Sequence, residues 1–222
     1  MSLERVLEPE VMDTPEEAEG YDAMDHREPN EAFVARLIEL GAGGFMLDIG
    51  TGPGHLPILI CERIAGTKVL GLDLSENMLR LARGHAGQSP FADRLQFEIG
   101  DAKGLNFPDH HFDTVYSNTI LHHIPDPAPF LKEAWRVLKP GGTFLIRDLF
   151  RPESEAQRDA LVEMHASDAN PYQKELFRAS LHAALRPEEL NQIAGDCGLD
   201  GAQVVVDSDR HMSLQKAAET ND

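Results

Sequence analysis

An aspartate and three glycines stand at alternate positions in the stretch LDIGTGPG, residues 47–54. Asp48 lies at the end of an apolar run, and Gly50, Gly52 and Gly54 follow it. Glycine loses more conformational freedom on folding than any other residue, so three within five positions weaken the fold locally. The stretch therefore predicts a ligand that approaches the backbone closely, with a carboxylate beside it.

The spacing of these glycines separates two classes of ligand. A dinucleotide-binding loop has the pattern G-x-G-x-x-G, whose last glycine lets helix and strand pack closely. Counted from Gly50 and Gly52, that last position is His55, so the pattern fails and a dehydrogenase is disfavoured. The acid two residues before Gly50 repels a pyrophosphate but suits a ligand that carries an ammonium group and a sulfonium.

Histidines supply the candidate general bases, because the unperturbed pKa of histidine lies near neutral pH. The candidates are His122 and His26, with His123 and Asp25 as alternatives. His122 and His123 stand near Asp126, but no HExxH pairing or cysteine cluster accompanies them, so we expect no metal site.

Strand-like and helix-like segments alternate from residue 45 onward and would position these side chains. Strands are expected at 45–50, 68–74, 94–101, 112–120, 139–150 (behind a tight turn), 202–208 and 211–217. Helices are expected at 30–40 (capped by Asn30), 55–66, 75–87, 127–138, 153–165, 172–185 and 187–198. This alternation predicts an α/β fold, with a doubly wound, mostly parallel seven-stranded sheet and helices on both faces.

The chain divides into two predicted parts. Residues 1–30 are rich in Glu and Asp and form an acidic arm, read either as a solvated arm or as a lid because it carries Tyr21, Met24 and His26. Residues 31–222 form the main domain, and residues 151–195 are expected to be a helical cap inserted late in it.

Bulk properties narrow the class of protein. The chain has 222 residues and a formal net charge of −18, which argues against a nucleic-acid partner because such binding uses clustered Lys and Arg. No signal peptide or membrane-spanning run is visible. Cys61 and Cys197 lack a CxxC spacing and fit two reduced thiols, so a cytoplasmic location is expected.

Four stretches in the same order resemble the class I S-adenosylmethionine-dependent methyltransferases, of the small single-domain type that includes the ubiquinone and menaquinone C-methyltransferases. These are LDIGTGPG, GLDLSENML, GDAKGLNFPDHHFDTVYSNTILHHI and LKEAWRVLKPGGTFLIRD, spanning roughly residues 45 to 150. The resemblance implies a Rossmann-like fold, S-adenosylmethionine as cofactor and S-adenosylhomocysteine as product.

The resemblance also implies a role for each site residue. Asp73 would bind both ribose hydroxyls, a bidentate task suited to a carboxylate. Asp101 and the Ala102 amide would read the adenine edge. The remaining cofactor residues are the backbone-close Gly50, Gly52 and Gly54, the adenine sandwich of Leu74 and Met78, the ammonium neighbours Asp48 and Asn118, and Tyr21 over the carboxylate.

The implied activity is transfer of a methyl group to a small-molecule acceptor by in-line displacement. The protein then holds donor and acceptor in near-attack geometry, and a base such as His122 or His26 is needed only for a protonated acceptor. Two alternatives stay open: a protein that binds the cofactor without methyl transfer or uses it for another reaction, and a nucleic-acid methyltransferase. The latter is disfavoured because SNTI stands where amino-group enzymes carry N/D-P-P-Y/F. The acceptor, its atom and the oligomeric state stay open.

Overall fold

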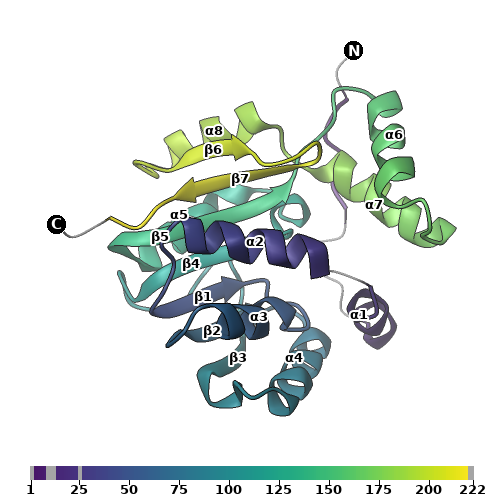
Figure 1. Ribbon diagram of the computed structural model, residues 1–222. Coiled ribbons are helices and arrows are strands. Elements are labelled where there is room, and N and C mark those ends of the chain that lie inside the picture. Colours follow the sequence, from purple (N-terminus) through teal and green to yellow (C-terminus); the bar gives the residue numbers. More distant parts are fainter. Residues whose placement is uncertain (1–2, 9–13, 25–26, 220–222) are drawn as a thin grey trace.

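The computed structural model describes residues 3–8, 14–24 and 27–219 and shows one seven-stranded sheet in the order β3-β2-β1-β4-β5-β7-β6 (Figure 1). The strands are β1 (Phe45–Ile49), β2 (Lys68–Asp73), β3 (Leu95–Ile99), β4 (Phe112–Asn118), β5 (Leu138–Leu149), β6 (Gln203–Val206) and β7 (His211–Lys216). The predicted α/β fold with a seven-stranded, mostly parallel sheet is confirmed.

The sheet reverses its winding direction between β1 and β4. β1 pairs in parallel with β2 on one side and with β4 on the other, while β7 runs antiparallel to both β5 and β6. In such open sheets, ligands bind outside the carboxyl ends of the strands at the point where the strand order reverses. The topology therefore places a binding site beyond Ile49, Asp73 and Asn118.

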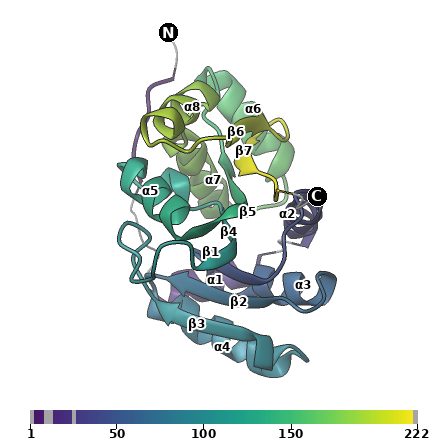
Figure 2. The same ribbon diagram turned by 90° about the vertical axis from the view of Figure 1, so that its left-hand side faces the viewer.

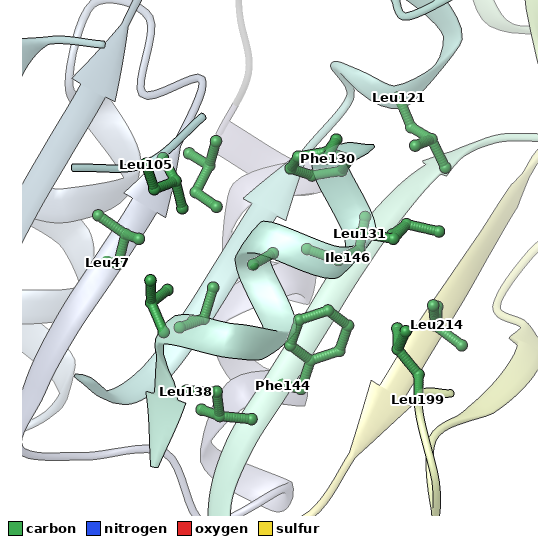
Figure 3. Close-up of a cluster of buried hydrophobic side chains, with 14 of the residues drawn as sticks. Leu47, Leu105, Leu121, Phe130, Leu131, Leu138, Phe144, Ile146, Leu199 and Leu214 are labelled. Atoms are coloured by element: carbon green, nitrogen blue, oxygen red, sulfur yellow. The ribbon is translucent and has the colours of Figure 1, made fainter. Parts of the chain in front are cut away.

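Helices cover both faces of the sheet (Figure 2). The principal layers are α2 (Arg27–Glu39), α3 (His55–Arg63) and α4 (Glu76–Gln88) on one face, with α5 (Pro127–Val137) and α8 (Pro187–Asp196) on the other. Successive residues of a strand point to opposite faces, so Leu47 packs with the α5 side and Met46 with the α2 side. Figure 3 shows the core on the α5 side of the sheet, where Phe130 of α5 lies among side chains of the central strands.

The described parts of the first thirty residues pack against the domain. Residues 3–8 run beside the late helices, where the Arg5 guanidinium donates to the carbonyl oxygens of Ala183 and Ile124. The short helix α1 (Pro15–Asp22) follows and contacts α4. Helix α2 begins at Arg27, so Asn30 lies inside it and is not its cap. Pro29 did not stop the helix because it stands in the first turn, where no intrahelical N–H bond is lost.

The late helices divide between two environments. Helices α6 (Glu155–His165) and α7 (Pro171–Ala183) pack on each other, and α7 contacts η2 (Leu121–His123), the single turn after β4. Helix α8 instead contacts β6, β7 and α5 and belongs to a layer on the sheet. In Figure 1, α1 and the α6–α7 pair flank the edge where β1 and β4 end. The division of the chain at residues 30 and 151–195 stays a prediction.

The structure also bears on the turn expected before β5, on the two cysteines and on membrane-spanning helices. The turn expected at Lys139 is part of β5, and the β4–β5 register shifts after the Phe112–Leu138 pair. Cys61 and Cys197 are both free thiols. Within the residues that the structure describes, no helix combines the length and apolar character needed to cross a membrane.

Candidate functional site

A cavity of about 140 Å³ opens at the carboxyl ends of the central strands. It lies at the reversal point of the sheet and is bounded by α1, the loops after β1 to β4, and η2. Nine of the eleven predicted cofactor residues line it: Tyr21, Gly50, Gly52, Asp73, Leu74, Met78, Asp101, Ala102 and Asn118. Asp48 and Gly54 do not line it.

Asp73 is the last residue of β2 and is held by backbone donors. Its Oδ2 accepts a hydrogen bond from the Gly52 amide at 2.8 Å, and its Oδ1 accepts one from the Ser75 amide at 2.9 Å. Burial raises the pKa of Asp73, while these amides act in the opposite direction. The carboxylate is therefore fixed in position at the cavity wall, where a ligand hydroxyl can reach it.

Asp48 lies on β1 behind the cavity wall. Its Oδ2 accepts a 2.8 Å hydrogen bond from the Thr51 hydroxyl, whereas the buried Oδ1 has no hydrogen-bond partner among the described residues. Burial raises the pKa of Asp48 to about 7. A buried acceptor without a donor is costly, so this position favours a cationic or N–H-bearing group nearby.

The glycines serve two purposes. At Gly52, where φ is +53°, an added Cβ would meet nothing closer than a Tyr21 ring carbon at 3.9 Å, so its backbone faces open space. At Gly54, where φ is +79°, an added Cβ would lie 2.9 Å from the Ala82 Cβ. Gly54 is thus required for helix packing, and Gly50, whose added Cβ would overlap Ile120, for strand-loop packing. Only Gly52 has the open approach expected of a ligand-contacting glycine.

The predicted adenine pocket is assembled from two loops. Leu74 and Met78 follow β2, and Asp101 and Ala102 follow β3. The Asp101 Oδ1 accepts a hydrogen bond from the Lys103 amide at 2.9 Å and pairs with its ammonium at 3.1 Å. Although burial raises the pKa of Asp101, these contacts outweigh it and lower that pKa. Apolar walls with an acid at the rim are suited to a flat, polar-edged ring.

Tyr21 of α1 reaches across the cavity to the end of β4. Its side chain is hydrogen-bonded to that of Thr119, and burial raises the pKa of the phenol, which is therefore neutral. Thr119 follows Asn118 directly and has a φ of 61°, which is a strained backbone conformation for a β-branched residue. The strained turn directs the chain from β4 to η2 along the cavity wall.

The candidate bases differ in whether they line the cavity. His122 does not line the cavity: its Nδ1 lies 2.6 Å from Asp148 Oδ1 and its Nε2 3.3 Å from Glu8 Oε1. Its neighbour His123 does line it. His26 and Asp25 lie outside the described residues.

Several residues of the site were not found from the sequence. Thr119, Ile120 and Ile124 line the cavity, and Glu8 and Asp148 surround His122. Asp148 lies in β5 among mostly apolar residues, and Glu8 lies in a segment without helix or strand periodicity. Asp126, which stands near the two histidines in the sequence, instead caps α5: its side chain accepts a hydrogen bond from the Ala128 amide.

The fold and the cavity define a doubly wound α/β protein with a ligand site at its reversal point. Residues 47–146 match a family model described as a methyltransferase domain. This segment of the chain is therefore similar to methyltransferase domains.

Two curated relatives illustrate the similarity in sequence. The chain is 36% identical over 149 residues to demethylmenaquinone methyltransferase of Symbiobacterium thermophilum, covering 62% of this chain and 57% of the relative. It is 35% identical over 130 residues to 27-O-demethylrifamycin SV methyltransferase of Amycolatopsis mediterranei, covering 59% of this chain and 47% of the relative. The chain spans about half the length of these curated relatives.

Among solved structures, the chain resembles phosphoethanolamine N-methyltransferase 2 of Haemonchus contortus in complex with phosphomonomethylethanolamine and S-adenosylhomocysteine. The TM-score is 0.64 at 27% identity, covering 81% of this chain and 38% of that one.

Proposed function

We propose that this protein transfers a methyl group from S-adenosylmethionine to a small-molecule acceptor. The observation that carries the proposal is the placement of Asp73: a carboxylate fixed by two backbone amides at the carboxyl end of β2, inside the cavity. Two fixed carboxylate oxygens suit the vicinal hydroxyls of a ribose. Support comes from the matched domain and from the complexes of similar proteins.

The residues around Asp73 fit the rest of such a cofactor. Leu74 and Met78 offer apolar surface beside the ribose position, and Asp101 lies at the outer rim for the adenine amino group. The open backbone of Gly52 and the unpartnered oxygen of Asp48 fit the amino-acid part, whose ammonium needs an acceptor. Tyr21 would close this part of the cavity from α1.

S-adenosylmethionine, when bound, supplies a methyl group on a sulfonium, which is reactive without further activation by the protein. The chain's own residues then orient the cofactor and the acceptor and shield them from water. Asp73 fixes the sugar, and Tyr21 with its Thr119 hydrogen bond limits water access to the cavity. The acceptor would enter between η2 and α1, where Ile120, His123 and Ile124 line the cavity.

The acceptor is proposed to be a small molecule because the similar proteins are named for quinone, rifamycin and phosphoethanolamine substrates. The net charge of −18 also opposes a polyanionic acceptor. His123 is better placed than His122 to accept a proton from such an acceptor, because only His123 borders the cavity.

The test is an acceptor screen with the purified protein and S-adenosylmethionine. Quinols, macrolactone hydroxyls and phosphorylated amino alcohols are the first panel, and product mass is read for a gain of one CH₂ with matching formation of S-adenosylhomocysteine. The proposal predicts that the wild type methylates at least one class of acceptor. Asp73→Ala should methylate none at the same cofactor concentration. Cofactor binding without transfer across a broadened panel would favour the non-transferring alternative, and absence of cofactor binding would remove both.

A further inference from the structure

Three side chains outside the proposed cofactor-binding set converge beside the single turn η2. Glu8 comes from the N-terminal segment, and His122 and His123 come from the turn itself. The Glu8 Oε1 lies 3.3 Å from His122 Nε2 and 3.2 Å from His123 Nδ1. The Glu8 and His122 side chains are only 10% and 5% exposed, so both are largely removed from water.

The orientation of His122 is set by a second carboxylate behind it. Its Nδ1 lies 2.6 Å from Asp148 Oδ1, and its backbone amide donates to Asp148 Oδ2 at 3.2 Å. Because Asp148 holds a proton on Nδ1, the lone pair of Nε2 is directed toward the Glu8 carboxylate oxygen. Nε2 and the Glu8 oxygen then face each other at 3.3 Å in a buried place, where either a proton on Nε2 or a metal ion must lie between them.

The spacing of the three ligand atoms is that of a metal site. Zinc binds nitrogen and carboxylate oxygen at about 2.0–2.1 Å, which puts neighbouring ligands of a tetrahedron about 3.3 Å apart. The two separations that involve Glu8 are 3.3 and 3.2 Å, and all three ligand atoms lie within 4.8 Å of one another. A carboxylate on the far nitrogen of a ligating histidine is the usual outer partner in such sites.

We propose that Glu8, His122 and His123 bind one divalent metal ion of the zinc type, with Asp148 as the outer partner that orients His122. Three protein ligands leave a fourth position open, the arrangement of zinc sites that also bind water or a substrate atom. His123 also lines the cavity, so the ion would lie next to the entrance for the acceptor. The proposal is separate from methyl transfer, because metal uptake is measured without cofactor or acceptor.

Neighbouring contacts hold the ligands in place. The Ser180 hydroxyl donates to Glu8 Oε1 at 3.1 Å, which ties this carboxylate to α7. The Arg5 guanidinium is a neighbouring cation, and it donates hydrogen bonds to the carbonyl oxygens of Ala183, Pro125 and Ile124 at 2.6 to 3.1 Å. Arg5 thus anchors the N-terminal segment that delivers Glu8.

The test is a metal titration of the full chain, purified without a histidine tag and stripped with a chelator. Cobalt(II) is added and followed by its visible absorption, and Zn²⁺ is then used to displace it. We expect one tight equivalent in the wild type. Glu8→Gln, which keeps size and shape, should weaken binding by about 100-fold or more, and Asp148→Asn by about 10- to 100-fold. His123→Ala provides an independent ligand deletion, and circular dichroism confirms that each variant is folded.

A second cluster of the described residues supplies the matched control. Asp22, His55 and His85 also place a carboxylate and two imidazoles within 4.8 Å, on α1, α3 and α4. His85→Ala should leave the tight equivalent unchanged. The proposal is overturned if the wild type takes up no stoichiometric metal, if Glu8→Gln binds it as tightly as the wild type, or if the bound equivalent disappears with His85→Ala.

Discussion

The Gly52 amide donates a 2.8 Å hydrogen bond to Oδ2 of Asp73, which joins the glycine loop after β1 to the acid at the end of β2. One carboxylate thereby shapes the loop and presents its remaining lone pairs to the cavity. A ligand that bridges the two strand ends would use both features at once.

Replacing Asp73 should weaken cofactor binding strongly. Asp73→Ala removes two charge-assisted hydrogen bonds to the ribose, each worth about 1.5–3 kcal/mol, so we expect at least a 100-fold rise in the dissociation constant. Calorimetry with S-adenosylhomocysteine measures it. Glu98→Ala is the matched control, because Glu98 is an exposed acid on neighbouring β3 and does not line the cavity. Equal losses in both variants would refute the role given to Asp73.

Asp48 should make the stability of the ligand-free protein depend on pH. Its pKa is raised from 3.8 to about 7, so between these values the folded protein holds a proton that the unfolded chain has lost. The free energy of unfolding therefore falls as pH rises through this window, and the cost persists above it. Asp48→Asn carries no such cost.

Urea unfolding at several pH values tests this account of Asp48. The stability of Asp48→Asn relative to the wild type should increase from pH 5 to pH 7 and then level off. The variant should also bind the cofactor more weakly than the wild type does. Comparison of the two proteins cancels the titration of the other acids. A stability difference that is the same at every pH would show that Asp48 ionises normally.

The Tyr21 hydroxyl should contribute modestly to cofactor binding. Tyr21→Phe keeps the ring over Gly52 but removes the hydrogen bond to Thr119, which costs about 0.5–1.5 kcal/mol and corresponds to a roughly 2- to 10-fold loss of affinity. Tyr172→Phe changes an exposed tyrosine of α7 and should have no effect. If Tyr21→Phe binds the cofactor as the wild type does, α1 does not close the cavity in the proposed way.

Gly54 should matter for folding rather than for ligand contact. Gly54→Ala places a methyl group against Ala82 in a left-handed backbone conformation, and we expect a loss of about 2–4 kcal/mol in the free energy of unfolding. Gly66→Ala has a similar φ of +78° but open space around it, so it isolates the backbone strain of about 1 kcal/mol. Thermal melting compares the two, and equal losses would contradict the packing role of Gly54.

The sequence predicts the parts of the site that lie at strand ends. Asp73 and Asn118 close β2 and β4, and parallel strands bring their carboxyl ends to one edge whatever the details of packing. The glycine loop was also predictable, although its residues divide into contact and packing roles that depend on Ala82 and Ile120, which no local pattern identifies.

The surroundings of His122 could not be predicted in this way. Glu8 reaches it through tertiary contacts of a segment without periodicity, and Asp148 is an inward-facing acid in a strand that reads as apolar. Helix α2 began earlier than expected because a proline in a first turn looks, in sequence, like a helix boundary.

A crystal structure of the protein with S-adenosylhomocysteine tests the central claim most directly. The adenosyl group should lie beyond β1 and β2, with both ribose hydroxyls within hydrogen-bonding distance of the Asp73 carboxylate and the backbone of Gly52 against the amino-acid part. A nucleoside bound elsewhere, or one whose sugar does not contact Asp73, would contradict the account.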